Sequence, residues 1–127
     1  MDDHLFAECE RFISDNKKRY EKLLEDVLSL AKYVRAIDTS ERIYRIYSRR
    51  DNRKEEGDFK KISKVAEKLA KWRKKYNPKS RVEDIHDIIG ITIVVHYDSD
   101  IEAVYQMITG SHQSRHLKIV PYLLEPD

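Results

Sequence analysis

The chain has 127 residues, of which 38% are charged, yet 25 basic and 23 acidic side chains leave a net charge of only +2. The length favours one domain with a core of ordinary size. The balance of charge argues against a general nucleic-acid coat and against a tail of a single sign. The single cysteine, Cys9, excludes an intramolecular disulfide and a cysteine zinc site.

Two further classes are excluded by what the sequence lacks. The chain has no apolar leader and no run of about 18 apolar residues, so we expect no membrane partner and a cytoplasmic location. Its only glycines are Gly57, Gly90 and Gly110. They cannot form either glycine-rich phosphate loop, so any bound phosphates must be held by Arg and Lys side chains, together with a metal.

The first 36 residues are predicted to form two amphipathic helices. Apolar residues recur at helical spacing over 3–14, where Cys9 is expected to be a core residue. A break is predicted at residues 14–16, and a second apolar stripe follows from Tyr20 to Val34. The polar group at 38–41 suits a turn or helix caps.

A basic segment follows over residues 42–75. Residues 41–75 carry 14 basic and 6 acidic side chains, whereas residues 76–127 carry 4 and 8. The stretch 43–47 fits a helix or a short strand, residues 51–58 are predicted to form a loop, and residues 59–76 a helix ended by Pro78. This order of charges would suit a partner that carries phosphates and a metal ion: the cations would bind the phosphates, and the carboxylates that follow would bind the metal.

Residues 84–122 are predicted to form a strand–helix–strand core. The strand spans 88–97 and is expected to be covered on both faces, because it is almost continuously apolar. Ser99 and Glu102 have the spacing of a capping box, and the next helix is predicted to end at Gly110. A second strand, interrupted by Pro121, is expected at an edge or a bulge.

A phosphoryl- or nucleotidyl-transfer site without a glycine loop needs a rigid carboxylate for Mg²⁺, several cations and an aromatic plane for the base. Asp87 stands at the entrance of the predicted strand, and the basic segment precedes it. Tyr44 and Tyr47 are candidate stacking groups. The simpler alternatives are a solvated turn for the acids, a wet helix face for the lysines and core packing for the tyrosines.

Two stretches resemble the RelA/SpoT-type alarmone synthetase domain: EDIHDIIGITIVVHYDSDIEAVYQMI (83–108) and, more loosely, YSRRDNRKEEGDFKKISKVAEKLAKWRKK (47–75). The resemblance implies an α+β, nucleotidyltransferase-like fold with helices packed on a small mixed sheet. The implied activity is pyrophosphate transfer from ATP to the 3′-hydroxyl of GDP or GTP.

By the same resemblance, Asp87 is the catalytic aspartate that holds Mg²⁺, the implied cofactor. The resemblance implies Lys68 and either Arg49 or Arg50 as phosphate-binding residues. Lys64, which falls where the family usually has serine, is a further candidate for phosphate binding, and Tyr47 is the candidate for base stacking on chemical grounds alone.

The sequence departs from the family pattern at several points. Thr92 stands where the family commonly has arginine. The family's second carboxylate and its guanosine-stacking tyrosine have no match, since Glu125 lies in a different context. We therefore expect residues 1–127 to form a single, partial synthetase domain with little or no catalysis of its own.

Three other functions stay open at this point. The resemblance extends to toxin-type relatives that pyrophosphorylate tRNA or make adenosine alarmones. A non-catalytic nucleotide- or RNA-binding regulatory module would explain Thr92. A helical interaction domain built on residues 3–36 would bind no nucleotide. The sequence also leaves open whether the chain forms a homo-oligomer.

Overall fold

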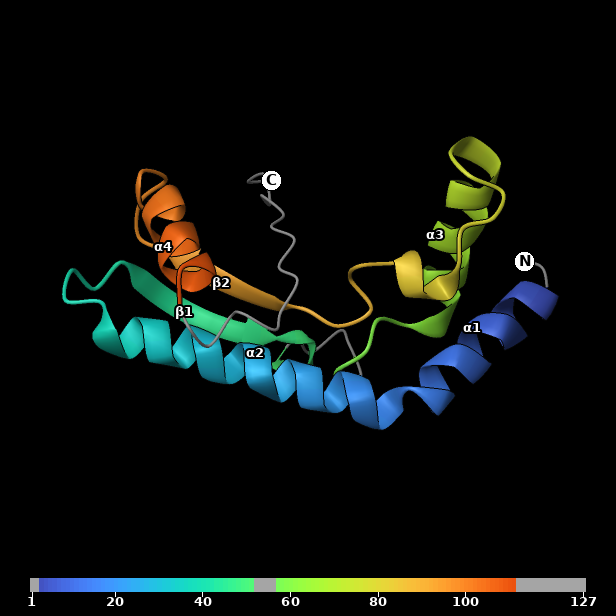
Figure 1. The fold of residues 1–127 in the computed structure, drawn as a ribbon, viewed down its shortest axis with the longest axis horizontal. Helices are drawn as coiled ribbons and strands as arrows, with labels where there is room; N and C mark the ends of the chain where they lie inside the picture. Colours follow the sequence, from blue (N-terminus) through green and yellow to red (C-terminus); the bar gives the residue numbers. More distant parts are fainter. Residues whose placement is uncertain (1–2, 52–56, 112–127) are drawn as a thin grey trace. The chain divides into compact units, whose positions relative to one another are not determined.

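The computed structural model describes residues 3–51 and 57–111, and these ranges contain four α-helices and a two-stranded antiparallel sheet (Figure 1). The elements are, in order, α1 (Asp3–Asp15), α2 (Lys17–Ile37), β1 (Ile43–Ser48), the 3₁₀ turn η1 (Arg49–Asp51), α3 (Ile62–Lys75), the 3₁₀ turn η2 (Val82–Asp84), β2 (Ile91–Val95) and α4 (Asp100–Thr109). None of these helices combines the length and apolar character needed to cross a membrane.

The chain divides into two compact units. The first contains residues from Met1–Leu28 and Tyr47–Thr92, and the second contains residues from Ser29–Ile46 and Ile93–Asp127. Helix α2 and both strands contribute residues to each unit. The predicted basic segment is therefore shared between the two units.

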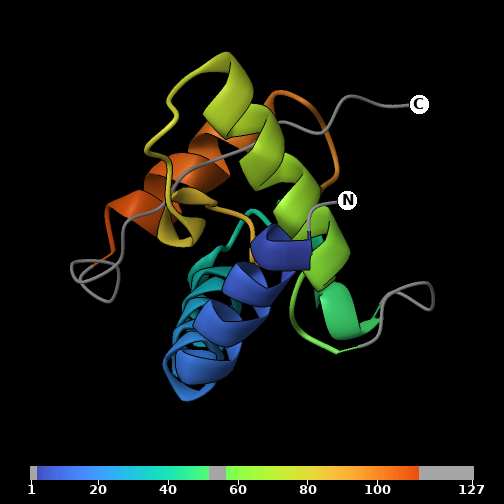
Figure 2. The ribbon, with the colours of Figure 1, turned by 90° about the vertical axis from the view of Figure 1, so that its right-hand side faces the viewer.

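The first unit is built around the contact between α1 and α3, which lie side by side (Figure 2). Each helix presents an apolar stripe at spacings of three and four residues, and this stripe is buried. Turn η2 and the residues after it close the same core, whose buried members are Leu5, Cys9, Ile13, Val65, Ala66, Leu69, Val82, Ile85 and Ile88. Cys9 is fully buried, as expected for a core residue.

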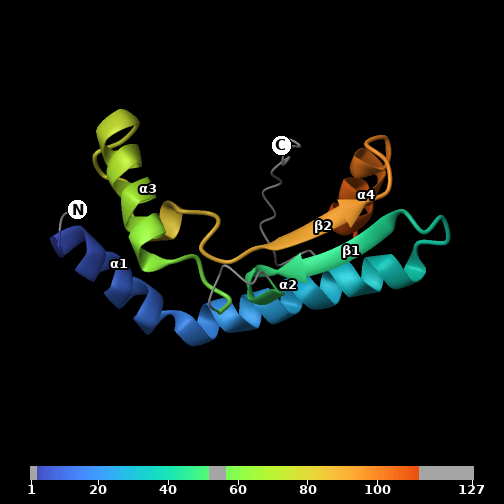
Figure 3. The ribbon, with the colours of Figure 1, turned by 180° about the vertical axis from the view of Figure 1, so that it is seen from behind.

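The second unit has its own core between the sheet and two helices. Leu30 and Val34 of α2 meet Ile43 of β1 and Val104 of α4. Figure 3 shows the two strands running together with α2 alongside β1. The sheet therefore rests on an apolar layer supplied by helices, as in other α+β folds.

The turn between α2 and β1 depends on Asp38. Its buried carboxylate accepts hydrogen bonds from the backbone N–H of Ser40 (3.1 Å) and of Arg42 (2.9 Å), and from the Arg42 guanidinium (2.8 Å). The backbone bond from Arg42 is the main cause that holds the pKa of Asp38 below its usual range, against the opposing effect of burial. Glu41, with φ of 50°, completes the reversal. The polar group 38–41 is thus a turn.

The helices follow the sequence prediction closely, and the ambiguous stretch 43–47 is strand β1. Helix α3 ends before Pro78, where the backbone N–H of Tyr76 donates to the carbonyl of Trp72 (2.8 Å). The last turn carries the basic residues Arg73, Lys74 and Lys75, whose positive charges interact favourably with the negative end of the helix dipole.

Three predictions about residues 84–122 require correction. The strand covers only Ile91–Val95, because Ile88 is a core residue of the preceding turn. All five residues of β2 are half-buried, so the described residues do not cover both faces. Ser99 precedes α4 but its side chain makes no capping hydrogen bond, because its own backbone is helical (φ −62°, ψ −18°). The predicted second strand lies outside the described residues.

Replacing Leu69 with alanine should reduce the free energy of unfolding by about 2–5 kcal/mol, because it leaves a cavity where α3 meets α1. Leu69 is 0% exposed, whereas Leu23 on α2 is 36% exposed. Leu23→Ala is therefore the matched control, with an expected loss below about 1 kcal/mol. Urea unfolding followed by circular dichroism measures both, and equal losses would contradict the described core.

Candidate functional site

The carboxylate of Asp87 lies between two lysine ammonium groups in the first unit. Lys60 Nζ is 2.9 Å from one carboxylate oxygen, and Lys68 Nζ is 3.1 Å from the other. The exposed fractions of the three side chains are 17% for Lys60, 26% for Lys68 and 30% for Asp87. Partial burial strengthens such pairs, because solvent screens them less than at an open surface.

The backbone around Asp87 is tied to the same neighbours. Arg49 of η1 donates from Nη2 to the Asp87 carbonyl oxygen (2.8 Å). The backbone N–H of Lys60 donates to the carbonyl of Ile88 (2.7 Å), and the Ile88 side chain is fully buried. Core packing and backbone hydrogen bonds therefore fix Asp87 in place. We call Arg49, Lys60, Lys68 and Asp87 the Asp87 cluster.

The Asp87 cluster has more positive than negative charge. Burial alone would raise the pKa of Asp87, but the hydrogen bonds and charges of Lys60 and Lys68 outweigh it and hold that pKa below its ordinary value. The carboxylate is thus ionised at neutral pH, and three cationic side chains meet around this one residue. Such a group of cations is suited to a polyanion such as a phosphate chain.

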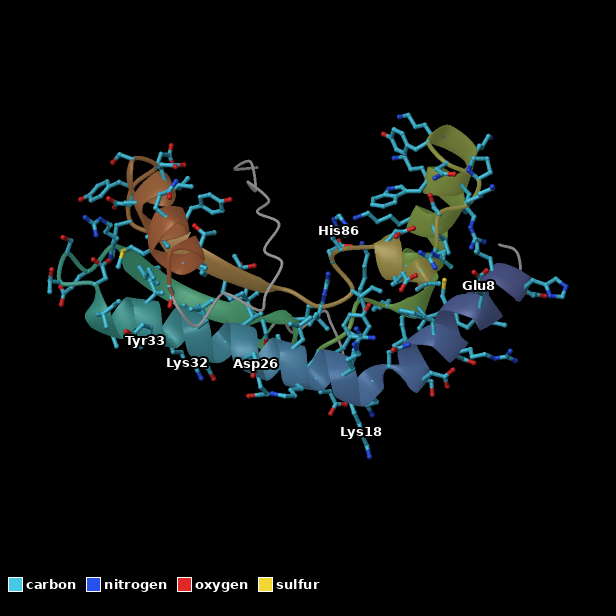
Figure 4. The ribbon with its side chains drawn as sticks, in the orientation of Figure 1. Glu8, Lys18, Asp26, Lys32, Tyr33 and His86 are labelled. Carbon is cyan, nitrogen blue, oxygen red and sulfur yellow. The ribbon has the colours of Figure 1, made fainter. Side chains whose placement is uncertain are left out.

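An aromatic border lies beside the cluster. Lys68 Nζ is 5.6 Å from the centroid of the Trp72 ring, and the exposed His86 ring meets Trp72 edge-on at 6.3 Å. Figure 4 shows His86 on the loop that follows η2. The Trp72 ring therefore attracts the Lys68 ammonium group through a cation–π interaction.

The neighbouring acids are turn residues. Asp84 accepts a hydrogen bond from the backbone N–H of Arg81 (2.8 Å), and Glu83 lies 3.0 Å from the Arg81 guanidinium. Asp87 is therefore the acid of this stretch that faces the cluster, as the sequence pattern suggested.

The cluster unites some of the residues singled out from the sequence. Arg49, Lys68 and Asp87 meet there. Lys64 is 63% exposed and its Nζ lies 3.6 Å from Glu67, whereas Tyr47 is half-buried. The side chain of Arg50 lies outside the described part of the structure.

Lys60 is the member of the cluster that sequence reasoning missed. It belongs to a Lys60–Lys61 pair just before α3, and nothing in the local pattern separates the two. Tyr44, the other stacking candidate, belongs to the second unit, where its ring meets His96 edge-on at 5.5 Å.

The described residues fit Mg²⁺ only together with a nucleotide. Mg²⁺ in nucleotide sites is typically held by one or two carboxylates plus substrate phosphates. Asp87 supplies one carboxylate, and both of its oxygens already accept lysine hydrogen bonds. Among the described residues no group of three His, Cys, Asp or Glu side chains could hold a metal by itself.

Comparison with known proteins found no matching family model, no matching curated protein and no matching solved structure.

The depressed pKa of Asp87 predicts a pH-dependent contribution to stability. The contribution is present above the unfolded pKa of about 3.9 and disappears as the pH falls through the lower, folded value. In Asp87→Asn, the unfolding free energy should fall below that of the wild type above about pH 5, and the gap should narrow at lower pH. Urea unfolding at several pH values measures the gap, and a gap independent of pH would contradict the ionised pair.

Proposed function

We propose that the chain binds the phosphates of a nucleoside triphosphate, with its metal, at the Asp87 cluster. The single observation that supports this is the convergence of Arg49, Lys60 and Lys68 on Asp87. Two lysines from separate segments contact the Asp87 carboxylate, and Arg49 contacts the Asp87 backbone carbonyl. These side chains provide positive charge for a phosphate chain, and the carboxylate provides a ligand for its metal. Such a site needs no glycine-rich loop.

Binding would exchange the partners of the two lysines. The phosphate oxygens of Mg·ATP would accept hydrogen bonds from Lys60 and Lys68, which release the Asp87 carboxylate. The freed carboxylate would then become available to the metal ion. The exchange keeps every charged group paired, and an unpaired charge in a partly buried site would be costly.

The proposed reaction is pyrophosphate transfer on a nucleotidyltransferase-like fold, with GDP or GTP as acceptor. The 3′-hydroxyl oxygen would attack the β-phosphorus of ATP, the bond from that phosphorus to AMP would break, and the hydroxyl proton would be released. The lysines and the metal would neutralise charge on the transferred group. Support for this reaction class comes from the resemblance of residues 83–108 and from the position of Asp87.

A non-catalytic nucleotide-binding module is the second candidate. Thr92 favours it, because the resembling family commonly has arginine at that position. This module would use the same Asp87 cluster for binding without transferring a phosphoryl group.

Calorimetric titration of Mg·ATP tests the site. We expect the wild type to bind, and Lys60→Ala and Lys68→Ala each to weaken binding by roughly tenfold, since each removes a charge-assisted phosphate contact. Lys18→Ala is the matched control, because Lys18 is an exposed lysine on α2 that points away from the ribbon (Figure 4). Equal losses in all three variants would reject the cluster as the phosphate site.

The role of Asp87 is tested in the same assay by comparing ATP with and without Mg²⁺. Asp87→Asn should lose the gain in affinity that Mg²⁺ gives. The same variant should bind metal-free ATP more tightly than the wild type, because it frees two ammonium groups. Identical Mg²⁺ dependence in both proteins would exclude Asp87 as a metal ligand.

ATP labelled on its γ-phosphate tests the reaction. With Mg²⁺ and GDP, AMP or tRNA as parallel acceptors, we expect weak transfer of label, greatest to GDP and abolished in Asp87→Asn. Transfer that is equal in Asp87→Asn would contradict the proposed mechanism. Nucleotide binding without transfer to any acceptor would favour the non-catalytic module.

A further inference from the structure

Helix α3 carries a straight row of lysines along one face. Lys64, Lys68, Lys71 and Lys75 follow one another at spacings of four, three and four residues. At 3.6 residues per turn, these positions fall within an arc of about 60° and span about 16 Å along the axis. We call these four residues the lysine row.

The region around the row is far more basic than the chain as a whole. Residues 60–81 contain 10 basic side chains and one acidic side chain, Glu67, whereas the whole chain has a net charge of +2. Within the described residues, no acidic side chain lies within ion-pair distance of Lys71 or Lys75, and both are exposed. The small net charge of the whole chain therefore conceals a local cationic surface.

Such a row is not the usual solvated helix face. Helix α2 of this chain pairs Lys17 with Glu21 and Lys22 with Asp26 at i,i+4 spacing. Like charges at the same spacing destabilise a helix, so the lysine row weakens α3 in isolation. This destabilisation is offset by the buried apolar face of the helix and by the pairing of Lys64 with Glu67 and of Lys68 with Asp87.

We propose that the lysine row and Tyr76 form a binding surface for single-stranded RNA. The row is longer than a nucleotide and suits successive phosphates of one strand. Tyr76 is 70% exposed at the C-terminal end of the row, with Lys75 Nζ 5.6 Å from its ring centroid. An exposed ring beside a line of cations is the arrangement on which an unpaired base stacks.

Two other polyanions fit the surface less well. An anionic membrane is bound by amphipathic helices that insert apolar side chains, but the apolar face of α3 is buried against α1. An acidic peptide would match the charge and would leave the exposed Tyr76 ring without a stacking partner.

Fluorescence anisotropy with a labelled RNA of about 12 unpaired nucleotides tests the proposal. If all four lysines contact phosphates, log affinity should fall with log salt at a slope of about −2.8, or roughly 50-fold between 50 and 200 mM salt. Lys71→Glu/Lys75→Glu should weaken binding by at least about tenfold and roughly halve the slope. Tyr76→Ala should weaken binding without changing the slope.

The matched control is Lys18→Glu/Lys32→Glu, which makes the same change in net charge on α2. Both side chains are exposed and point outward in Figure 4. Affinity close to wild type is expected for this control. Equal losses in the two double variants, or competition by polyglutamate as strong as by unlabelled RNA, would overturn the proposal. The absence of RNA binding by the wild type would overturn it as well.

The surface and the nucleotide site can be separated, because Lys71 and Lys75 lie outside the Asp87 cluster. Lys71→Glu/Lys75→Glu should keep its helical circular dichroism and its Mg·ATP affinity. Retained nucleotide binding with lost RNA binding supports the surface independently of the proposed reaction. Loss of both ligands with an intact helical spectrum would reject the assignment of RNA binding to the row.

Discussion

The pairing of Asp87 with Lys60 and Lys68 is the constraint on which the first unit's chemistry depends. Without the carboxylate, two partly buried ammonium groups would face each other, and without the lysines, a partly buried carboxylate would lack its partners. Neither the two lysines nor the carboxylate would be favourable in this partly buried position without the other. A ligand that separates the pair must therefore offer both negative oxygen atoms and a positive charge, and Mg·ATP offers both.

The hydrophobic core determines where that pair stands. Ile85 and Ile88 are almost completely buried, while His86 is exposed and Asp87 lies at the boundary. The segment is anchored at both ends by apolar side chains, and its polar residues face outward between them. The position of Lys68 is fixed by the adjacent Leu69, which is fully buried in the core that α3 shares with α1. The same packing that stabilises the unit therefore orients its charged groups.

The helices could be predicted from the sequence because their apolar spacing is a local property. The strand at 88–97 was predicted too long, since its apolar run serves two purposes: Ile88 fills the first core, and only Ile91–Val95 pair with β1. Arg49, Lys68 and Asp87 were identified through a family pattern. Lys60 was missed because its role arises from the tertiary approach of residues 27 positions apart. The prediction that Ser99 caps α4 was wrong, because the spacing between Ser99 and Glu102 does not determine the backbone angles of Ser99, which are helical.

Helix α3 has a buried apolar face and a charged face. Val65, Ala66 and Leu69 join it to the core, Lys68 turns toward Asp87, and the remaining lysines face solvent. Lys68 belongs both to the Asp87 cluster and to the lysine row, so the cationic surface is continuous with the proposed phosphate site. A polyanion bound along α3 and a nucleotide bound at Asp87 would share this one ammonium group. Because one ammonium has only three donors, the two ligands should influence each other's affinity, and by linkage that influence must be reciprocal.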